Sequence, residues 1–190
     1  EVSLMFSGHD DDKSGSFNGA GVGTDSLDLP FIELGDIRQS LADAENQIYT
    51  TATEGKFEGT VIITPQCMVS FLFMLLQNYV ADGVILDGTS QWKDKLGQQV
   101  TDPRLTVRIA PLHDAVVCGE RYTQEGFLSE DYDVIRDGVL KQFGLSAYIA
   151  NKVGGKRAPN TAANMVVSPG DTTLEDMIAG TKKGLLVSRF

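Results

Sequence analysis

The sequence is poor in the residues that most often hold metal ions or form covalent cross-links. It has two cysteines, Cys67 and Cys118, and two histidines, His9 and His113. Two cysteines cannot form a framework of disulfides, so we expect a reducing, cytoplasmic setting. No His-Glu-x-x-His and no Cys-x-x-Cys motif occurs. The usual sequence patterns of a zinc site are therefore missing.

Long apolar runs and an excess of basic residues are missing as well. The longest apolar stretch, Cys67 to Leu76, is interrupted by Ser70, and a membrane-spanning helix needs about 20 apolar residues. The 16 Lys and Arg residues are outnumbered by 26 Asp and Glu, so the net charge is −10. Nucleic-acid binding requires clustered cations that face phosphates. We therefore expect no membrane segment and no direct contact with nucleic acid.

The first third of the chain contains one long turn-rich segment between apolar ones. Ser7–Gly23 is rich in Gly, Asp and Ser and is typical of a loop. Its Asp10-x-Asp12-x-Ser14-Gly15 imitates the start of a calcium loop, but Gly21 stands where the bidentate Glu belongs. Around this loop we expect a strand over Glu1–Phe6 and a helix from Asp36 to about Thr51.

The remaining chain alternates between strand and helix patterns. Val61–Ile63 predicts a buried strand, and Thr64-Pro65 starts an apolar helix that runs to Val80. The clearest hairpin is Val134–Arg136, Asp137-Gly138, Val139–Lys141, because Asp-Gly favours a type I′ turn. The fold class is therefore α+β, with three or four helices packed on a mixed, largely antiparallel curved sheet.

The segment Asn164–Val187 is a compact strand, turn, helix and strand. Thr172 with Glu175 predicts a capping box at the helix start. Lys182 and Lys183 suit the last turn, and Gly184 suits the position after it.

Few residues indicate chemistry by their type and position. His113, Asp114 and Cys118 could converge on a metal, although a surface-loop histidine is the plainer interpretation. Cys67 at a helix start could be an activated thiol, but on so apolar a helix it is better explained as a packed one. Glu125 could place a carboxylate in a cleft, and Lys156-Arg157 could bind an anion. These residues alone identify no catalytic group.

Several motifs resemble the TldD/PmbA family in their order and spacing. They are Glu125-Gly126, Val134-Ile135-x-x-Gly138-Val139-Leu140-Lys141, Asn164, Pro169-Gly170-Asp171, and Gly184 with Val187. The resemblance covers about Val61 to Val187 and is clearest over 57–190, with 1–56 a looser lead-in. It implies that 1–190 is one domain, a central-to-late part of the family's C-terminal domain, cut from a longer protein.

The resemblance implies a cytoplasmic two-subunit peptidase system that trims unfolded peptides. TldD carries zinc on a helix with His-Glu-x-x-x-His, and the corresponding positions here are Phe73, Met74 and Asn78. Phe and Met cannot replace imidazole and carboxylate ligands. The chain is therefore similar to the TldE (PmbA) side of the family, with no catalytic residue and no metal of its own, and zinc is expected only in a partner subunit.

The function implied is a non-catalytic partner subunit that shapes a peptide groove, with Glu125, Arg157 and Asn164 as groove candidates. The family's longer loop before the Asn is here only Gly154–Pro159. The partners expected are a TldD-like zinc-bearing subunit or a second copy in a dimer, and an unfolded peptide. Two alternatives stay open: an active metallopeptidase with atypical ligands, and an interaction module of the gyrase-modulator type.

Overall fold

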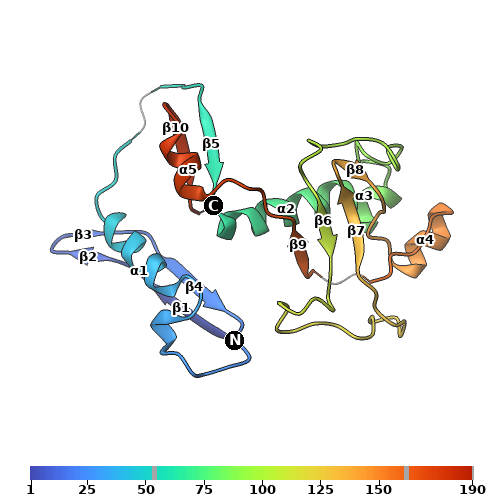
Figure 1. Cartoon of the computed structure of the whole chain (residues 1–190), viewed down its shortest axis with the longest axis horizontal. Helices are drawn as coiled ribbons and strands as arrows, with labels where there is room; N and C mark the ends of the chain where they lie inside the picture. Colours follow the sequence, from blue (N-terminus) through green and yellow to red (C-terminus); the bar gives the residue numbers. More distant parts are fainter. Residues whose placement is uncertain (53–54, 161–162, 190) are drawn as a thin grey trace. The chain divides into compact units, whose positions relative to one another are not determined.

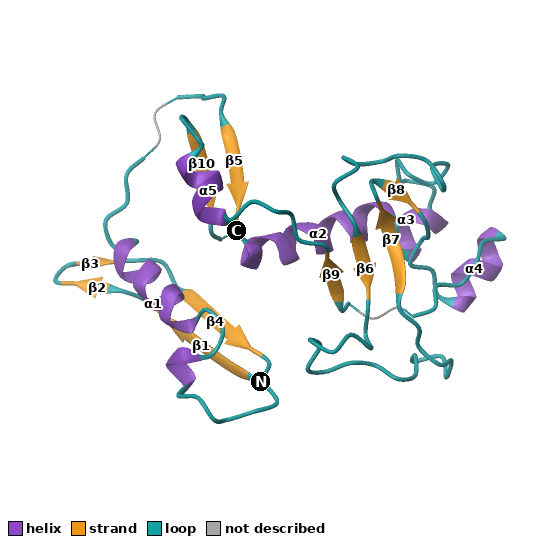
Figure 2. Ribbon diagram, viewed as in Figure 1, coloured by secondary structure: helices purple, strands orange, loops and turns teal. Residues whose placement is uncertain are grey.

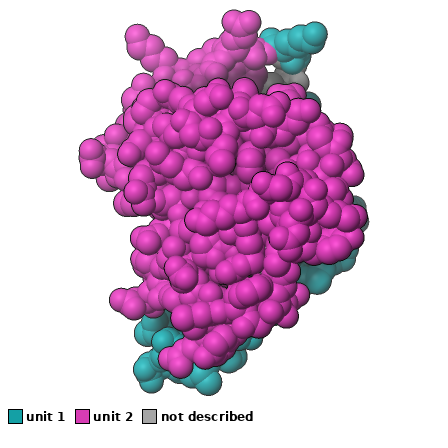
Figure 3. All heavy atoms as spheres, turned by 90° about the vertical axis from the view of Figure 1, so that its right-hand side faces the viewer, with its two compact units in different colours: residues 1–56 teal, residues 57–190 magenta. Residues whose placement is uncertain are grey.

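The computed structural model describes residues 1–52, 55–160 and 163–189. Contacts between Cα atoms divide the chain into two compact units, residues 1–56 and 57–190 (Figure 3). Helices and antiparallel strands occur in both units (Figure 2), which confirms the α+β class. No helix in the described part of the chain has the length and apolar character needed to cross a membrane.

The first unit is a short helix packed on an antiparallel strand pair. Ile37 at the start of the helix is fully buried against Ala20 and Leu34, and Val2 and Phe6 pack around them. The helix is shorter than the sequence predicts, since it ends at Asn46 rather than near Thr51. The elements are β1 (Val2–Phe6), β2 (His9–Asp10), β3 (Lys13–Ser14), β4 (Asn18–Val22), a 3₁₀ turn (Phe31–Glu33) and α1 (Ile37–Asn46).

The expectation of a loop over Ser7–Gly23 is wrong. This segment forms the β2–β3 hairpin and then β4, which pairs with β1 in the register Leu4↔Ala20. The Gly, Asp and Ser content of this segment suggests a loop, but the small side chains of β4 serve a packing role. They allow β4 to lie against α1, where Asn18 and Ala20 are buried. Asp11, with φ +48°, makes the hairpin turn.

The core of the second unit lies between a four-stranded antiparallel sheet and an apolar helix (Figure 1). The strand order is β8-β7-β6-β9, so β9 is an edge strand. Leu72 and Leu76 of the helix pack against Val107 and Ile135 of the two central strands. The elements are α2 (Pro65–Tyr79), β6 (Val107–Ile109), β7 (Tyr132–Arg136), β8 (Val139–Leu140) and β9 (Met165–Val167).

Strand register decides which side chains face α2. Val107 pairs with Ile135 and Val167, and Ile109 pairs with Tyr132 and Met165. A register shift between Val107 and Arg108 lets Ile135 and Tyr132, three positions apart on β7, both pack into the core. The other face is charged, because Arg108 lies opposite Asp133 with its Nε atom 3.8 Å from a carboxylate oxygen. Arg136 makes a second ion pair with Asp133.

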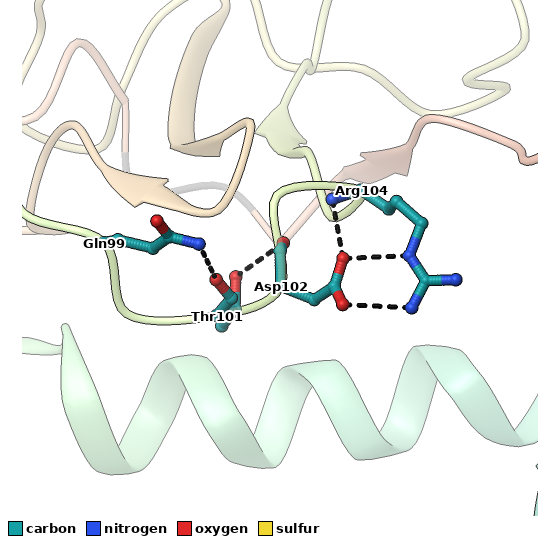
Figure 4. A network of polar contacts seen from close by, with 4 residues as sticks. All are labelled: Gln99, Thr101, Asp102 and Arg104. Carbon is teal, nitrogen blue, oxygen red and sulfur yellow. Dashed lines mark hydrogen bonds and ion pairs between the residues drawn. The ribbon is translucent and has the colours of Figure 1, made fainter.

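The predicted hairpin is confirmed. Asp137 and Gly138 have φ of +52° and +75°, as a type I′ turn requires. The preceding loop closes over this turn, since the N–H groups of Val100 and Thr101 both donate to the Gly138 carbonyl oxygen. The loop is braced by a bidentate pair between Arg104 and Asp102, with both N–O distances 2.9 Å (Figure 4). Hydrogen bonds from Arg104 hold the pKa of the Asp102 carboxyl at about 2.

The segment Asn164–Val187 forms the strand, helix and strand that its sequence predicts, but the helix ends differ. The elements are β9, α5 (Leu174–Ala179) and β10 (Gly184–Val187), and β10 pairs in parallel with β5 (Thr60–Ile63). Thr173, not Thr172, caps the helix. Gly184 begins β10 and does not end the helix, because the chain leaves helical geometry after Gly180.

Two short helices flank the sheet. They are α3 (Asp82–Leu86) and α4 (Ala147–Val153). They are tied together by the N–H of Ser146, which donates to the Asp82 carboxylate at 2.9 Å. Gly154 ends α4 in the left-handed conformation, with φ +67°.

Candidate peptide-binding site

A small apolar cavity lies between α2 and the buried face of the sheet. Its volume is about 110 Å³, and an engineered cavity of about 150 Å³ in another protein holds benzene. The space therefore suits one apolar group of moderate size. The lining includes Phe73 and Gln77 of α2, Ile109 of β6, Tyr132 of β7, Gly144, and Met165 of edge strand β9.

The resemblance to the TldD/PmbA family places that family's zinc ligands at Phe73, Met74 and Asn78, which lie on α2 beside this cavity. Phe73 lines the cavity, and Phe73 and Met74 are 44% and 61% exposed. The Asn78 side chain donates to the Met74 carbonyl oxygen at 2.7 Å, so it bonds within its own helix. A zinc ion needs imidazole, thiolate or carboxylate donors. These three side chains supply none, and they do not fit the metal.

The scattered histidines and cysteines are not assembled elsewhere. The ring Nδ1 of His113 accepts a hydrogen bond from the Ala115 N–H at 3.1 Å, which is a local turn contact. Cys67 is 5% exposed within α2, while Cys118 is exposed. Across residues 1–52, 55–160 and 163–189, no three His, Cys, Asp or Glu side chains are grouped closely enough to share a metal ion.

The outer edge of β9 presents backbone groups to a further strand. Ser168 donates to Thr106 at 3.2 Å, and Ala110 donates to Asn164 at 2.8 Å, so residues of even number bond to β6. Antiparallel pairing alternates, which turns the N–H and C=O groups of Met165 and Val167 outward. Within the described residues no strand pairs with this edge.

Tyr132 and Gln77 supply the polar side chains of the cavity wall, and Tyr132 is the titratable one. Burial raises the pKa of its phenol to about 12, because the charged phenolate would lose its hydration. A Cβ atom placed at Gly144 would lie 3.7 Å from the Tyr132 hydroxyl oxygen, so the ring reaches the far wall of the cavity. The phenol is therefore a neutral hydrogen-bonding group at neutral pH.

The structure gives Glu125 a structural partner. Both of its carboxylate oxygens accept from the N–H of Ala147, at 3.0 and 3.1 Å. This N–H is the first of α4, where a carboxylate is favoured by the helix dipole. Glu125 therefore anchors the 121–129 loop to α4, and it is not among the residues that line the apolar cavity.

Arg157 joins the same loop, whereas Asn164 lies beside the cavity. The Arg157 guanidinium stacks 3.9 Å from the centre of the Phe127 ring and donates to the Ala158 carbonyl at 2.7 Å. Asn164 stands between Ala163 and Met165, which both line the cavity. The structure thus brings Glu125 and Arg157 to one loop and leaves Asn164 at another place, at the start of β9.

Sequence reasoning missed the residues that form the cavity wall. The sequence patterns place Met165 on a strand and Gln77 on a helix, and they give no role in a site to these residues or to Tyr132. One signal was present in the sequence: Gln77 and Asn78 are two adjacent polar positions that follow the apolar run Phe71–Leu76. The strand register that brings Tyr132 and Met165 to the same face was not contained in any local pattern.

Comparisons with known proteins agree on one group of proteins. The chain is 26% identical over 149 residues to a metalloprotease of Methanocaldococcus jannaschii, covering 70% of this chain and 32% of that protein. It is 28% identical over 121 residues to the metalloprotease PmbA of Escherichia coli O157:H7, covering 63% and 27%. The chain therefore spans about a third or less of the length of these curated relatives.

Solved structures share the fold. TldE from Thermococcus kodakarensis superposes with a TM-score of 0.74 at 18% identity, over 98% of this chain and 44% of that one. A protein described as a modulator of DNA gyrase, from Bacteroides thetaiotaomicron, superposes with a TM-score of 0.73 at 19% identity, over 99% and 42%.

The described elements make up an α+β protein, and the two solved structures share its fold. The sequence model of the PmbA/TldA metallopeptidase C-terminal domain matches residues 55–190, and the chain belongs to this family. The resemblance seen from Val61 to Val187 is thereby confirmed.

Proposed function

We propose that this chain acts as a non-catalytic subunit of a peptide-processing metallopeptidase in the cytoplasm, beside a zinc-bearing relative or a second copy. The observation that carries the proposal is the composition of α2. In a family named for metallopeptidases, the resemblance places Phe73 and Met74 where zinc ligands are expected, and Phe73 lines an apolar cavity. Such a surface binds an apolar group and cannot activate a water molecule for hydrolysis.

The peptide-binding role is supported by the edge of β9 and the cavity next to it. An extended peptide can add to an open sheet edge through backbone hydrogen bonds, which tolerate varied sequences. Every second side chain of that peptide faces the same side of the sheet as Met165. One apolar side chain of the peptide would then enter the cavity of about 110 Å³.

Zinc content and hydrolysis test the absence of catalysis. The purified chain should bind no stoichiometric zinc by elemental analysis and should leave an unfolded fluorogenic peptide uncleaved. The same peptide should be cleaved by a His-Glu-x-x-x-His relative from the same organism, and faster when this chain is added. Zinc-dependent cleavage by the chain alone would contradict the proposal, and its loss in His113→Ala would favour an enzyme with atypical ligands.

Hydrogen exchange tests the edge. A neutral unfolded peptide should slow exchange at the amides of Met165 and Val167, because each donates to the added strand. The amides of Val166 and Ser168 already bond to β6 and serve as internal controls. Val167→Pro removes one outward donor and should weaken peptide binding about tenfold. Protection confined to other segments would exclude β9 as the binding edge.

A further inference from the structure

A second cavity of the same unit is lined by lysines. Its volume is about 360 Å³, within the range of ligand sites. Lys93, Lys141 and Lys156 stand around apolar side chains that include Ile85, Leu96 and Phe143. We name this cavity the lysine cleft. It lies between the 88–99 loop, the segment after β8 and the turn after α4.

The charge of the lysine cleft is opposite to that of the protein. The chain carries a net charge of −10, yet the described lining of the cleft contains three lysines and no Asp or Glu. Fields of exposed charges decay over about 8–10 Å at physiological salt. The three lysines are the charged residues of the described lining, so they attract an anion to the cleft although the chain as a whole is acidic.

The walls of the lysine cleft are held in place by hydrogen bonds. The N–H of Gly97 donates to the Leu140 carbonyl at 2.8 Å, which ties the 88–99 loop to β8. The N–H of Ala158 donates to the carbonyl of fully buried Leu145 at 2.8 Å, which ties the turn after α4 to the cleft floor. The Gln142 amide also donates to the Arg157 carbonyl at 3.1 Å. A preformed cleft loses little entropy when a ligand binds.

One chain segment separates the lysine cleft from the apolar cavity beside β9. Gly144 lines the apolar cavity, and its neighbours Phe143 and Leu145 line the lysine cleft. The N–H of Gly144 donates to the Val80 carbonyl at 3.0 Å, which fixes this wall. A ligand that occupies the lysine cleft is thus adjacent, across a single strand of backbone, to the site assigned to the peptide.

We propose that the lysine cleft selects acidic peptides: it binds a peptide segment whose Asp or Glu carboxylates face the three lysines while an apolar side chain rests on the floor. The inference rests on the proposed peptide-processing function and names the substrate class. A peptide is the ligand that fits best, because the cleft offers both cationic and apolar side chains. Leu96 and Val153, 54% and 39% exposed, offer apolar contact beside the cations. A nucleic-acid strand requires a longer basic track and stacking side chains.

Binding of defined peptides to the intact chain tests whether the lysine cleft selects acidic peptides. The probe is a fluorescein-labelled twelve-residue peptide with alternating Glu and Leu, and fluorescence anisotropy reports the Kd. Replacing its Glu residues by Gln should weaken binding at least tenfold at low salt, and replacing its Leu residues by Gly should weaken it about fivefold. In the triple variant Lys93→Gln, Lys141→Gln, Lys156→Gln, the affinity for the Glu peptide should fall at least tenfold. The affinity for the Gln peptide should fall less than twofold.

A matched triple variant controls for net charge. Lys95→Gln, Lys152→Gln, Lys182→Gln removes three exposed lysines that do not line the cleft and should change the Kd less than threefold. Equal losses in the two triple variants would overturn the proposal, as would tighter cleft-dependent binding of a single-stranded RNA. A peptide that binds only through a free C-terminal carboxylate, and not when amidated, would also overturn it.

The result separates this inference from the proposed function. If the Gln peptide binds as tightly as the Glu peptide and still protects β9 from exchange, only the lysine cleft is excluded. If neither peptide binds, the peptide-binding function itself is wrong.

Discussion

The second unit contains two regions of similar local design and different burial. In the sheet β8-β7-β6-β9 with α2, Val107, Ile135 and Leu140 are 0% exposed. In the region of β5, α5 and β10, Leu185 and Leu186 are each 46% exposed, and α5 contains no buried residue. Both regions consist of regular strands and one helix joined by turns. The difference lies in how much apolar surface each one removes from water.

The factors that form a helix or strand therefore differ from those that stabilise it. Turn chemistry and a capping threonine are enough to define the strand, helix and strand over 164–187. Stability scales with buried apolar area, at about 25 cal/mol per Å², and on that scale the β6–β7 region dominates. We therefore expect substitutions in the two regions to differ in size even where the residue types are the same.

Paired leucine truncations test this difference with the largest expected effect. Leu140→Ala should lower the free energy of unfolding by about 2–5 kcal/mol, because it leaves a cavity in a closed core. Leu186→Ala, in β10, should cost about 1 kcal/mol or less, since its side chain is half solvated already. Urea unfolding followed by circular dichroism measures both. Equal losses would show that the β5–β10 region is as tightly packed as the core.

Glycine substitutions at two turns form the next pair. Gly138→Ala should destabilise by about 2–4 kcal/mol, because a Cβ atom at φ +75° would lie 2.6 Å from the Thr101 carbonyl oxygen. Gly126 also has positive φ, +83°, but nothing lies within 4 Å of its Cβ position. Gly126→Ala should therefore cost only about 1 kcal/mol from backbone strain.

Thermal unfolding of the two glycine variants separates crowding from backbone conformation. The Gly138 variant should melt well below the Gly126 variant. If both variants melt at the same temperature, then the closure of the 97–106 loop over the hairpin contributes nothing to stability. The packed region would then not include the contacts between this loop and Gly138.

The pH dependence of stability reports the dry environment of Tyr132. Its pKa is raised from 10.0 to about 12 by burial. Between these values the unfolded chain loses the phenolic proton while the folded chain keeps it, so the folded state is disfavoured as pH rises. The contribution is complete below pH 10 and is lost by about pH 12, and it amounts to about 2–3 kcal/mol.

Tyr132→Phe should flatten this decline, measured as the free energy of unfolding from pH 9 to 12. Tyr148→Phe, at a position that is 63% exposed, is the matched control and should leave the decline unchanged. A decline that is identical in wild type and Tyr132→Phe would mean that water reaches the phenol.

Sequence patterns predicted the elements of the second unit well because its local signals agree with its packing. The Asp-Gly hairpin, the apolar α2 and the strand at Met165–Val167 all follow from spacing of a few residues. The sequence patterns do not predict β4, because its small side chains suit contact with α1, which no local window reveals. They do not predict β2 and β3 either, because each has two residues, all of them exposed. The predicted cap of α5 is wrong by one residue, because Thr172 and Thr173 are both followed by an acidic residue three positions later.

The candidate site was less predictable than the fold. The resemblance is enough to compare Phe73, Met74 and Asn78 with the family's zinc-ligand motif, because that motif lies within one helix. The apolar cavity and the lysine cleft could not, because each is built from segments more than 50 residues apart whose side chains meet only through sheet register and loop closure. Glu125 and Arg157 were selected from motifs, and their observed contacts are with the fold itself.

The smallest expected effect comes from removing the cap of α5, in the exposed region of β5, α5 and β10. The Thr173 hydroxyl accepts from the Asp176 N–H at 3.1 Å and donates to the Asp176 carboxylate at 2.8 Å. Thr173→Ala should cost about 1 kcal/mol of local stability, which corresponds to about fivefold faster exchange of the α5 amides. Thr172→Ala should leave exchange unchanged. Because α5 buries no residue, the cap is a large share of what holds it, and the shift should be confined to α5 while the amides of β6 and β7 exchange as before. Faster exchange in those strands would mean that the two regions unfold together, and that burial in one region supports the other.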